Sequence, residues 1–448
     1  MKIHPFRKSI LLVTLAAVML LSACKIVSTN ENPLETERTR QTTTAKTDRT
    51  QRTTEKQSAS TPRTTAATAI EEAPYTTMGI AVTEAPYVEE APATEPIEVP
   101  AYREPVIELI GFYLPELEDR FFLKELAGES MDVFMQVYSA IMAFEPEVIF
   151  DEPITLDRMT NVMMLINYAC PELMQVDCNY TYYTNAQNLC TAIEFCYILD
   201  VDTYIWACRE IRDTFDILRD QTHGMSMPEK ERFAYELLID VCTYNDTTLH
   251  SGTCFGAVLE GVARCEGYAK AFMWMMWALD IPCMTVTGAT LEDDVRHAWN
   301  VVCIDGNYAI VDVTFDDVED YGEQYPVPYA YFNVTDEFVA NNRIMDTLYS
   351  ILRKPECNNE SMSFHVSNGS YCNDRTDPID FFIHQVFRTV EMGESRVYFQ
   401  CGSQQGFWDV LDAIDYLLPE VLSSCLNGWG YNWYSYSDGQ TIIVDLQY

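Results

Sequence analysis

Three residues in the second half of the chain have side chains suited to nucleophilic catalysis, and they follow one another as Cys265, His297 and Asp312. A thiol can attack a carbonyl carbon, an imidazole can remove and return a proton, and a carboxylate can fix the imidazole tautomer. This order of residue types predicts cysteine-based acyl transfer, provided that the fold brings the three side chains together.

The segment around Cys265 predicts an activated thiol. Glycines at 261 and 267 flank the cysteine, and the apolar residues that follow recur at helical spacing as far as Leu279. We therefore expect Cys265 to begin a helix. The unpaired N–H groups at a helix N-terminus favour thiolate over thiol and can also form part of an oxyanion hole.

His297 and Asp312 lie on two segments that we expect to form a β-hairpin. Arg296–Val302 and Tyr308–Asp316 have the pattern of strands, and Asp305-Gly306 between them is a strong turn signal. If those two residues form the loop, His297 pairs with Thr314 and Trp299 with Asp312. His297 and Asp312 are then diagonal neighbours on one face, with Cβ atoms roughly 7–8 Å apart. A slip of one residue would place them on opposite faces.

Each signal alone also has a structural explanation. One cysteine among 15 is more often a core residue than a nucleophile, and a single histidine on a strand is more often structural than catalytic. The combination, in order and with this predicted register, favours the catalytic interpretation.

The same residues carry a family resemblance. "CEGYAKAF", "HAWNVV" and "IVDVTFDD" closely resemble motifs of the transglutaminase-like superfamily, over about residues 230–340. Tyr331–Asp336 also resembles the strand that follows in that family. The resemblance implies a papain-like α+β core with Cys265 as nucleophile, His297 as base and Asp312 as the residue that orients it. Phe315 stands where a tryptophan is common, and we expect Phe315 and Trp299 to be packing residues.

The resemblance also implies an auxiliary contribution to the oxyanion hole. Tyr244 is our candidate upstream of Cys265, and Glu266, which directly follows Cys265, is a second auxiliary candidate. This chemistry requires no metal or organic cofactor. The acidic run Asp316–Asp320 could bind calcium, but it lacks EF-hand spacing, and a solvated acidic loop is the simpler interpretation.

The chain of 448 residues is long enough for several domains. We predict an α+β protein with a helical region over 101–228, a transglutaminase-like domain over 229–350 and a small α+β module over 362–448. In the first region Met131–Phe144, Leu156–Tyr168 and Asn185–Leu199 have helical spacing. Ser226 and Glu229 predict the start of the next helix. The last module should end in a hairpin with its turn at Ser437-Asp438-Gly439.

The N-terminus predicts export and lipid anchoring. Residues 1–24 have a basic start, an apolar stretch Ser9–Leu21 and then Leu21-Ser22-Ala23-Cys24, which resembles a bacterial lipoprotein cleavage box. Cys24 would carry the lipid. Residues 25–100 are rich in Thr, Glu, Pro and Ala and are expected to form a disordered tether. We therefore expect a protein at the cell surface, held to the membrane through the N-terminal lipid alone.

The net charge and the cysteine spacing disfavour nucleic-acid binding, a zinc site and a complete set of disulfides. A formal net charge of −39 disfavours nucleic acid as a ligand. The 15 cysteines lack zinc spacing, and an odd remainder after Cys24 and Cys265 disfavours a complete disulfide framework, so Cys196, Cys208, Cys242 and Cys303 are expected to be buried thiols.

Two functions remain open at this point. The first is surface-anchored acyl transfer on peptide or glutamine-type amides, by hydrolysis or transamidation, with a protein or peptide substrate such as a cell-wall peptide. The second is a non-catalytic adhesion or scaffold protein that uses the same fold for binding. The sequence does not determine the oligomeric state.

Overall fold

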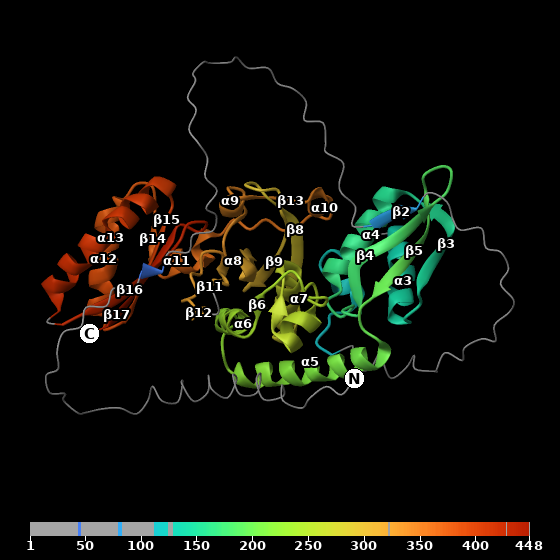
Figure 1. Ribbon diagram of the computed structural model, residues 1–448, viewed down its shortest axis with the longest axis horizontal. Coiled ribbons are helices and arrows are strands. Elements are labelled where there is room, and N and C mark those ends of the chain that lie inside the picture. The colour runs from blue at the N-terminus through green and yellow to red at the C-terminus, as the bar shows by residue number, and fades with distance from the viewer. Residues whose placement is uncertain are drawn as a thin grey trace, which may run out of the picture.

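The computed structural model describes residues 112–123, 129–320, 323–426 and 428–447, together with two short strands, β1 (Thr44–Ala45) and β2 (Gly79–Val82). Cys24 and the predicted signal lie outside the described residues, as does the predicted tether apart from these two strands. At β1 and β2 the prediction of a disordered tether is wrong, because each pairs with a strand of a folded sheet. Figure 1 shows three bodies along the long axis, with the first at one end, a central core, and the C-terminal module at the other end.

The first body contains a β-sheet as well as helices, so the prediction of helix alone over 101–228 is wrong. Its sheet has the order β2-β4-β5-β3. Two of the three predicted helices form, as α3 and α4. The elements are η1 (Leu117–Asp119), α3 (Glu129–Met142), β3 (Glu147–Ile154), α4 (Leu156–Ala169), β4 (Val176–Thr184) and β5 (Cys190–Tyr197).

The third predicted helix, Asn185–Leu199, is instead a turn followed by strand β5. The Asn185 side chain accepts hydrogen bonds from the N–H groups of Gln187 and Leu189, both at 3.0 Å, and Asn188 has a φ of 58°. This turn reverses the chain so that β5 pairs antiparallel with both β4 and β3. Sheet pairing therefore decides the conformation of apolar residues whose spacing also suited a helix.

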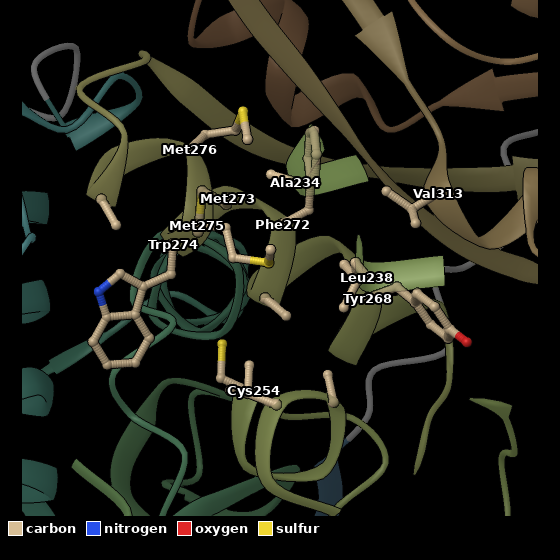
Figure 2. Packing of buried hydrophobic residues seen from close by; sticks show 14 of the residues in the cluster. Ala234, Leu238, Cys254, Tyr268, Phe272, Met273, Trp274, Met275, Met276 and Val313 are labelled. Atoms are coloured by element: carbon tan, nitrogen blue, oxygen red, sulfur yellow. The ribbon is translucent and has the colours of Figure 1, made fainter. Parts of the chain in front are cut away.

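The central core is an antiparallel sheet packed against a buried helix. Strands β8 (Cys283–Thr290), β9 (Arg296–Ile304), β10 (Asn307–Val311) and β13 (Arg343–Met345) form the sheet in the order β10-β9-β8-β13. Helix α7 (Cys265–Ala278) packs on β8 and β9, and residues 266–278 of it are all buried. Figure 2 shows its Phe272, Trp274, Met275 and Met276 among residues of neighbouring elements.

Further helices and short strands enclose α7. Helix α6 begins with a complete capping box between Ser226 and Glu229, as predicted. The elements around α7 are α5 (Val201–Gln221), α6 (Met227–Val241), β6 (Thr243–Tyr244), the π-helical segment η3 (Phe255–Glu260) and β7 (Val262–Ala263).

The predicted hairpin register is confirmed where the strands pair, but the second strand is shorter than expected. Asn307 pairs with Ile304 and Val311 with Asn300, which leaves Asp305-Gly306 as the loop. Strand β10 ends at Val311, and Asp312 then caps a short helix, α8 (Val313–Asp316), by accepting a hydrogen bond from the Phe315 N–H. The predicted strand over 313–316, including a Thr314 partner for His297, is therefore wrong, because an aspartate at this position satisfies the first turn of a helix.

The segment after α8 connects the core to the C-terminal module. It contains β11 (Glu319–Asp320), β12 (Glu323–Gln324), α9 (Asp336–Val339), α10 (Thr347–Ile351), η4 (Glu360–Met362) and α11 (Phe364–Ser367). The strand expected over Tyr331–Asp336 is reduced to a single bridge between Val334 and Ile310.

The C-terminal module has the predicted alternation of strands and helices and the predicted terminal hairpin. Its sheet has the order β1-β16-β17-β15-β14, with α12 and α13 packed together and against β15. The hairpin closes with Tyr436 opposite Thr441. The elements are β14 (Tyr371–Cys372), α12 (Pro378–Glu391), β15 (Arg396–Cys401), α13 (Gln404–Cys425), β16 (Gly430–Tyr436) and β17 (Thr441–Gln447).

The cysteines of the described part are free thiols, and most are buried. Cys208 and Cys242 are buried as expected, and Cys303 is half-buried. Cys196 is exposed, contrary to expectation, because it lies on the outward side of β5. Within the same part of the chain, no helix combines the length and the apolar character needed to cross a membrane.

We predict that Phe272→Ala destabilises the core strongly. The Phe272 ring is fully buried on the helix that carries Cys265, so its removal leaves a cavity that should lower the free energy of unfolding by about 3–5 kcal/mol. Denaturant unfolding would measure the change. Trp408→Ala, at a residue that is 42% exposed, is the control and should change stability by less than about 1 kcal/mol. Equal effects would contradict this view of the core.

Candidate active site

Cys265 is the first residue of α7, as predicted, and the chain before it is built to place it there. Gly261 ends η3 with a φ of 67°, a conformation that glycine adopts at no steric cost. Strand β7 then pairs with β6 and leads into the helix. The N–H groups of the first turn have no carbonyl within the helix to bond, and the half-exposed thiol is carried by the first residue of this turn.

Gly267 permits the close packing of this first helical turn. A Cβ at position 267 would lie 2.3 Å from the Ser251 carbonyl oxygen and 2.9 Å from the Ala263 Cβ. The loop before η3 therefore presses directly against the start of α7. Any larger residue at 267 would move the turn that carries Cys265.

His297 links Cys265 to Asp312. The imidazole Nε2 lies 2.7 Å from the Asp312 Oδ2, and the interaction of His297 with Cys265 is among the causes that raise the pKa of the imidazole. Since Nε2 is engaged by the carboxylate, Nδ1 is the ring nitrogen left for the thiol. The fold thus brings together the three residues that the sequence predicted, although they come from a helix, a strand and a helix cap.

Asp312 is the most buried member of the group, with an exposed fraction of 1%. Its Oδ1 accepts a hydrogen bond from the Phe315 N–H, and its own N–H donates to the Tyr331 carbonyl at 3.1 Å. Its Oδ2 is shared between His297 and the guanidinium of Arg343. The carboxylate is therefore fixed on every side by partners from three segments.

Arg343 was not identified from the sequence. It is 3% exposed, forms an ion pair with Asp312, and has its guanidinium 4.5 Å from the Phe315 ring centroid, 4.8 Å from that of Tyr331 and 5.2 Å from that of Trp299. Stacking on aromatic faces and pairing with a carboxylate suit arginine better than lysine. Because strand β13 is short and distant in sequence from the hairpin, no local pattern pointed to this residue.

These contacts shift the two pKa values in opposite directions. Burial alone would lower the pKa of His297, but the charge of Asp312 and the hydrogen bonds to Asp312 and Cys265 raise it to about 9. Burial alone would raise the pKa of Asp312, but the charges of His297 and Arg343 hold it at about 2. An imidazolium beside a carboxylate is thus the favoured state near neutral pH.

Aromatic rings enclose the imidazole. Trp299 stacks on it with ring centroids 5.8 Å apart, and Phe315 meets it edge-on at 4.6 Å. Both rings also contact Arg343, so the expected packing role of Trp299 and Phe315 is confirmed.

The two auxiliary candidates lie near Cys265 in different ways. Tyr244 is on β6 opposite Ala263, which precedes Cys265 by two residues, and 44% of the Tyr244 surface is exposed. Glu266 is buried, and both its carboxylate oxygens are engaged, one by the Tyr168 hydroxyl at 2.7 Å and the other by Arg264 at 2.6 Å. Glu266 therefore positions α7 against α4, and an auxiliary role in catalysis for either residue stays a prediction.

Asp316 corrects the expectation of a solvated acidic loop. Its buried carboxylate accepts hydrogen bonds from the N–H groups of Ala330 and Tyr331, both at 3.0 Å, and from the Tyr235 hydroxyl. Burial raises the pKa of Asp316 to about 7. In the part of the chain that the structure describes, no group of three or more His, Cys, Asp or Glu side chains is placed to hold a metal ion.

Comparison with known families supports the assignment of the core. Residues 216–313 match the family model described as the transglutaminase-like superfamily. This stretch contains Cys265, His297 and Asp312, and the resemblance found from the motifs is confirmed over it. The core of this α+β protein is therefore transglutaminase-like. None of the curated proteins matches the chain.

Three solved structures share a distant likeness with the chain. They are a "Putative Cysteine Protease" from Cytophaga hutchinsonii at 16% identity, covering 35% of this chain and 55% of the other, and a TGase at 12%, covering 40% and 53%. The third is menin, whose structure reveals the binding site for the Mixed Lineage Leukemia (MLL) protein, at 13% identity, covering 60% and 53%. This chain spans little more than half the length of each. Each TM-score is 0.23, which carries no argument about function.

We predict that His297 makes stability depend on pH in a defined direction. The pKa of His297 is raised from 6.5 to about 9, which means that the folded state holds the proton more tightly than the unfolded state. The stabilisation that the protonated imidazole contributes to the folded state is therefore fully present below pH 6.5 and is lost as pH rises through about 9. Unfolding measured from pH 6 to 10 in wild type and His297→Gln isolates it as a difference. That difference should shrink as pH rises, and a constant difference would contradict the prediction.

We predict that Arg343→Met is more damaging than the same change at an exposed arginine. Removing Arg343 deprives the buried Asp312 carboxylate of one of its two cations, and breaking a buried ion pair typically costs about 3–5 kcal/mol of stability. Arg396→Met is the matched control, because the Arg396–Asp445 pair is partly exposed and should contribute about 0–1 kcal/mol. Denaturant unfolding of both variants checks this, and similar losses would count against a special role for Arg343.

Proposed function

We propose that this protein catalyses cysteine-dependent acyl transfer on peptide or glutamine-type amides. The observation that carries the proposal is the 2.7 Å contact between His297 and the buried Asp312, with the Cys265 thiol at a helix N-terminus interacting with the same imidazole. The match of residues 216–313 to a transglutaminase-like family supports the same reaction class.

The chemistry follows from the positions of these groups. The Cys265 thiolate attacks the amide carbonyl carbon, and the oxyanion that forms is stabilised by N–H groups of the first turn of α7. His297 gives its proton to the leaving amine as the C–N bond breaks, which leaves a thioester on Cys265. His297 then takes a proton from water or from a second amine, which attacks the thioester and releases the acid or a new amide.

The substrate and the setting are part of the proposal. We favour hydrolysis of peptides, including cell-wall peptides, over cross-linking, by analogy of fold alone. A lipid on Cys24 would hold the protein at the outer side of a bacterial membrane, with residues 25–100 as a tether to the folded part.

The experiment is thiol alkylation with iodoacetamide near pH 6, followed by peptide mapping, in wild type and His297→Ala. An ordinary thiol is almost fully protonated at that pH and reacts slowly. We expect Cys265 to react at least about tenfold faster than Cys196 and Cys425, which are exposed and serve as internal controls, and to lose this advantage in the variant.

Labelling of Cys265 no faster than that of the two exposed cysteines would contradict the proposal and would favour a non-catalytic scaffold. If fast labelling is found, a screen of peptide amides for ammonia or amine release, with Cys265→Ala as control, would identify the substrate class.

A further inference from the structure

The C-terminal module and the preceding helix α11 contact residues 326–331 of the core. This segment leads to the candidate active site, because its Tyr331 carbonyl accepts a hydrogen bond from the Asp312 N–H. The Tyr436 hydroxyl donates to the Pro326 carbonyl at 2.8 Å, and the buried His365 Nε2 donates to the Pro328 carbonyl at the same distance. Tyr329 stacks on Phe364 with centroids 4.1 Å apart. Figure 1 shows the module beside the part of the core that carries α8.

The turn of the terminal hairpin, Ser437–Gln440, takes part in this contact through Asp438 and Gly439. A Cβ built on Gly439 would lie 2.2 Å from the Ala330 Cβ, so only a glycine allows the turn to sit at its observed depth. The Gln400 amide donates to the Gly439 carbonyl at 3.1 Å. The Tyr331 hydroxyl donates to the Asp438 carbonyl, also at 3.1 Å.

Ala330 and Tyr331, the residues under this turn, hold the buried carboxylates of the site. Their N–H groups donate to Asp316, and the Tyr331 carbonyl accepts from the Asp312 N–H. The Tyr331 ring lies against the Arg343 guanidinium, which pairs with Asp312. A shift of the backbone at 330–331 would therefore move Asp312 through two independent contacts.

We propose that the turn Ser437–Gln440 is a positioning element of the candidate active site, so that the core and the C-terminal module act as one unit. The turn presses on Ala330, Tyr331 holds Asp312 and Arg343 in place, and Asp312 orients His297. The module is thus required for reactivity at Cys265 and is not a separable accessory. This inference rests on the proposed function, because its readout is the reactivity of Cys265.

The test uses the full chain and four variants. Gly439→Ala introduces the clash with Ala330, while Gly428→Ala, at a glycine of the same module with nothing within 4 Å of the added atom, is the matched control. Ala330→Gly removes the atom that the new methyl group would meet, so the double variant Gly439→Ala/Ala330→Gly should relieve the clash. Tyr331→Phe keeps the ring beside Arg343 and removes only the hydroxyl contacts.

The readout is the rate of Cys265 alkylation as a function of pH, with thermal unfolding measured in parallel. We expect Gly439→Ala to lower the rate at pH 6 at least about tenfold and to move the midpoint of the profile upward, toward that of an ordinary thiol near pH 8.5. The double variant should recover the rate to within about threefold of wild type, and Gly428→Ala should not change it. Tyr331→Phe should show a smaller change in the same direction.

The outcomes separate this inference from the proposed function. A slow, unselective Cys265 in wild type would contradict the proposed function and this inference with it. A fast wild-type Cys265 whose profile is unchanged in folded Gly439→Ala would overturn only the role of the turn. If Gly439→Ala does not fold, a wild-type profile in Tyr331→Phe would overturn it equally.

Discussion

One buried carboxylate constrains the arrangement of the candidate active site. Asp312 is taken out of water at the end of a central hairpin, and a charge in such a place is tolerated only when it is paired and hydrogen-bonded. Its partners are His297 from the adjacent strand, Arg343 from the far edge of the sheet, and N–H groups of the chain around it. In the sheet order β10-β9-β8-β13, the two cations reach Asp312 from the neighbouring strand and from the opposite edge.

The position of Cys265 depends on a second buried polar group, Glu266, which links the core to the first body. Glu266 accepts hydrogen bonds from Arg264 beside it and from Tyr168 on α4, while Lys270 donates to Asn167 on the same helix at 2.6 Å. Cys265 itself packs in a small cluster with Tyr168 and Met164. The start of α7 is therefore held from the N-terminal side, as Asp312 is held from the C-terminal side.

The contacts of Asp312 and Glu266 join the regions on either side to the core, and the apolar packing does the same. One apolar cluster runs from the first body into β8, β9 and the segment near residue 350, so the boundaries predicted at 228 and 350 do not coincide with breaks in packing. Only the third cluster, within the C-terminal module, is formed by that module alone. The stretch matched by the family model is thus embedded in neighbours on both sides.

The sequence by itself determined the local features of this protein. Short-range chemistry accounts for the helix start at Cys265, the capping box at Ser226 and the Asp305-Gly306 turn. The turn then sets the strand register that places Asp312 beside His297. Only the tertiary structure decided that Asn185–Leu199 is a turn and a strand, that α8 replaces the end of the second hairpin strand, and that Arg343 shares Asp312. Pairing partners, burial and the path of distant segments settle such features, and none of these is encoded in local residue spacing.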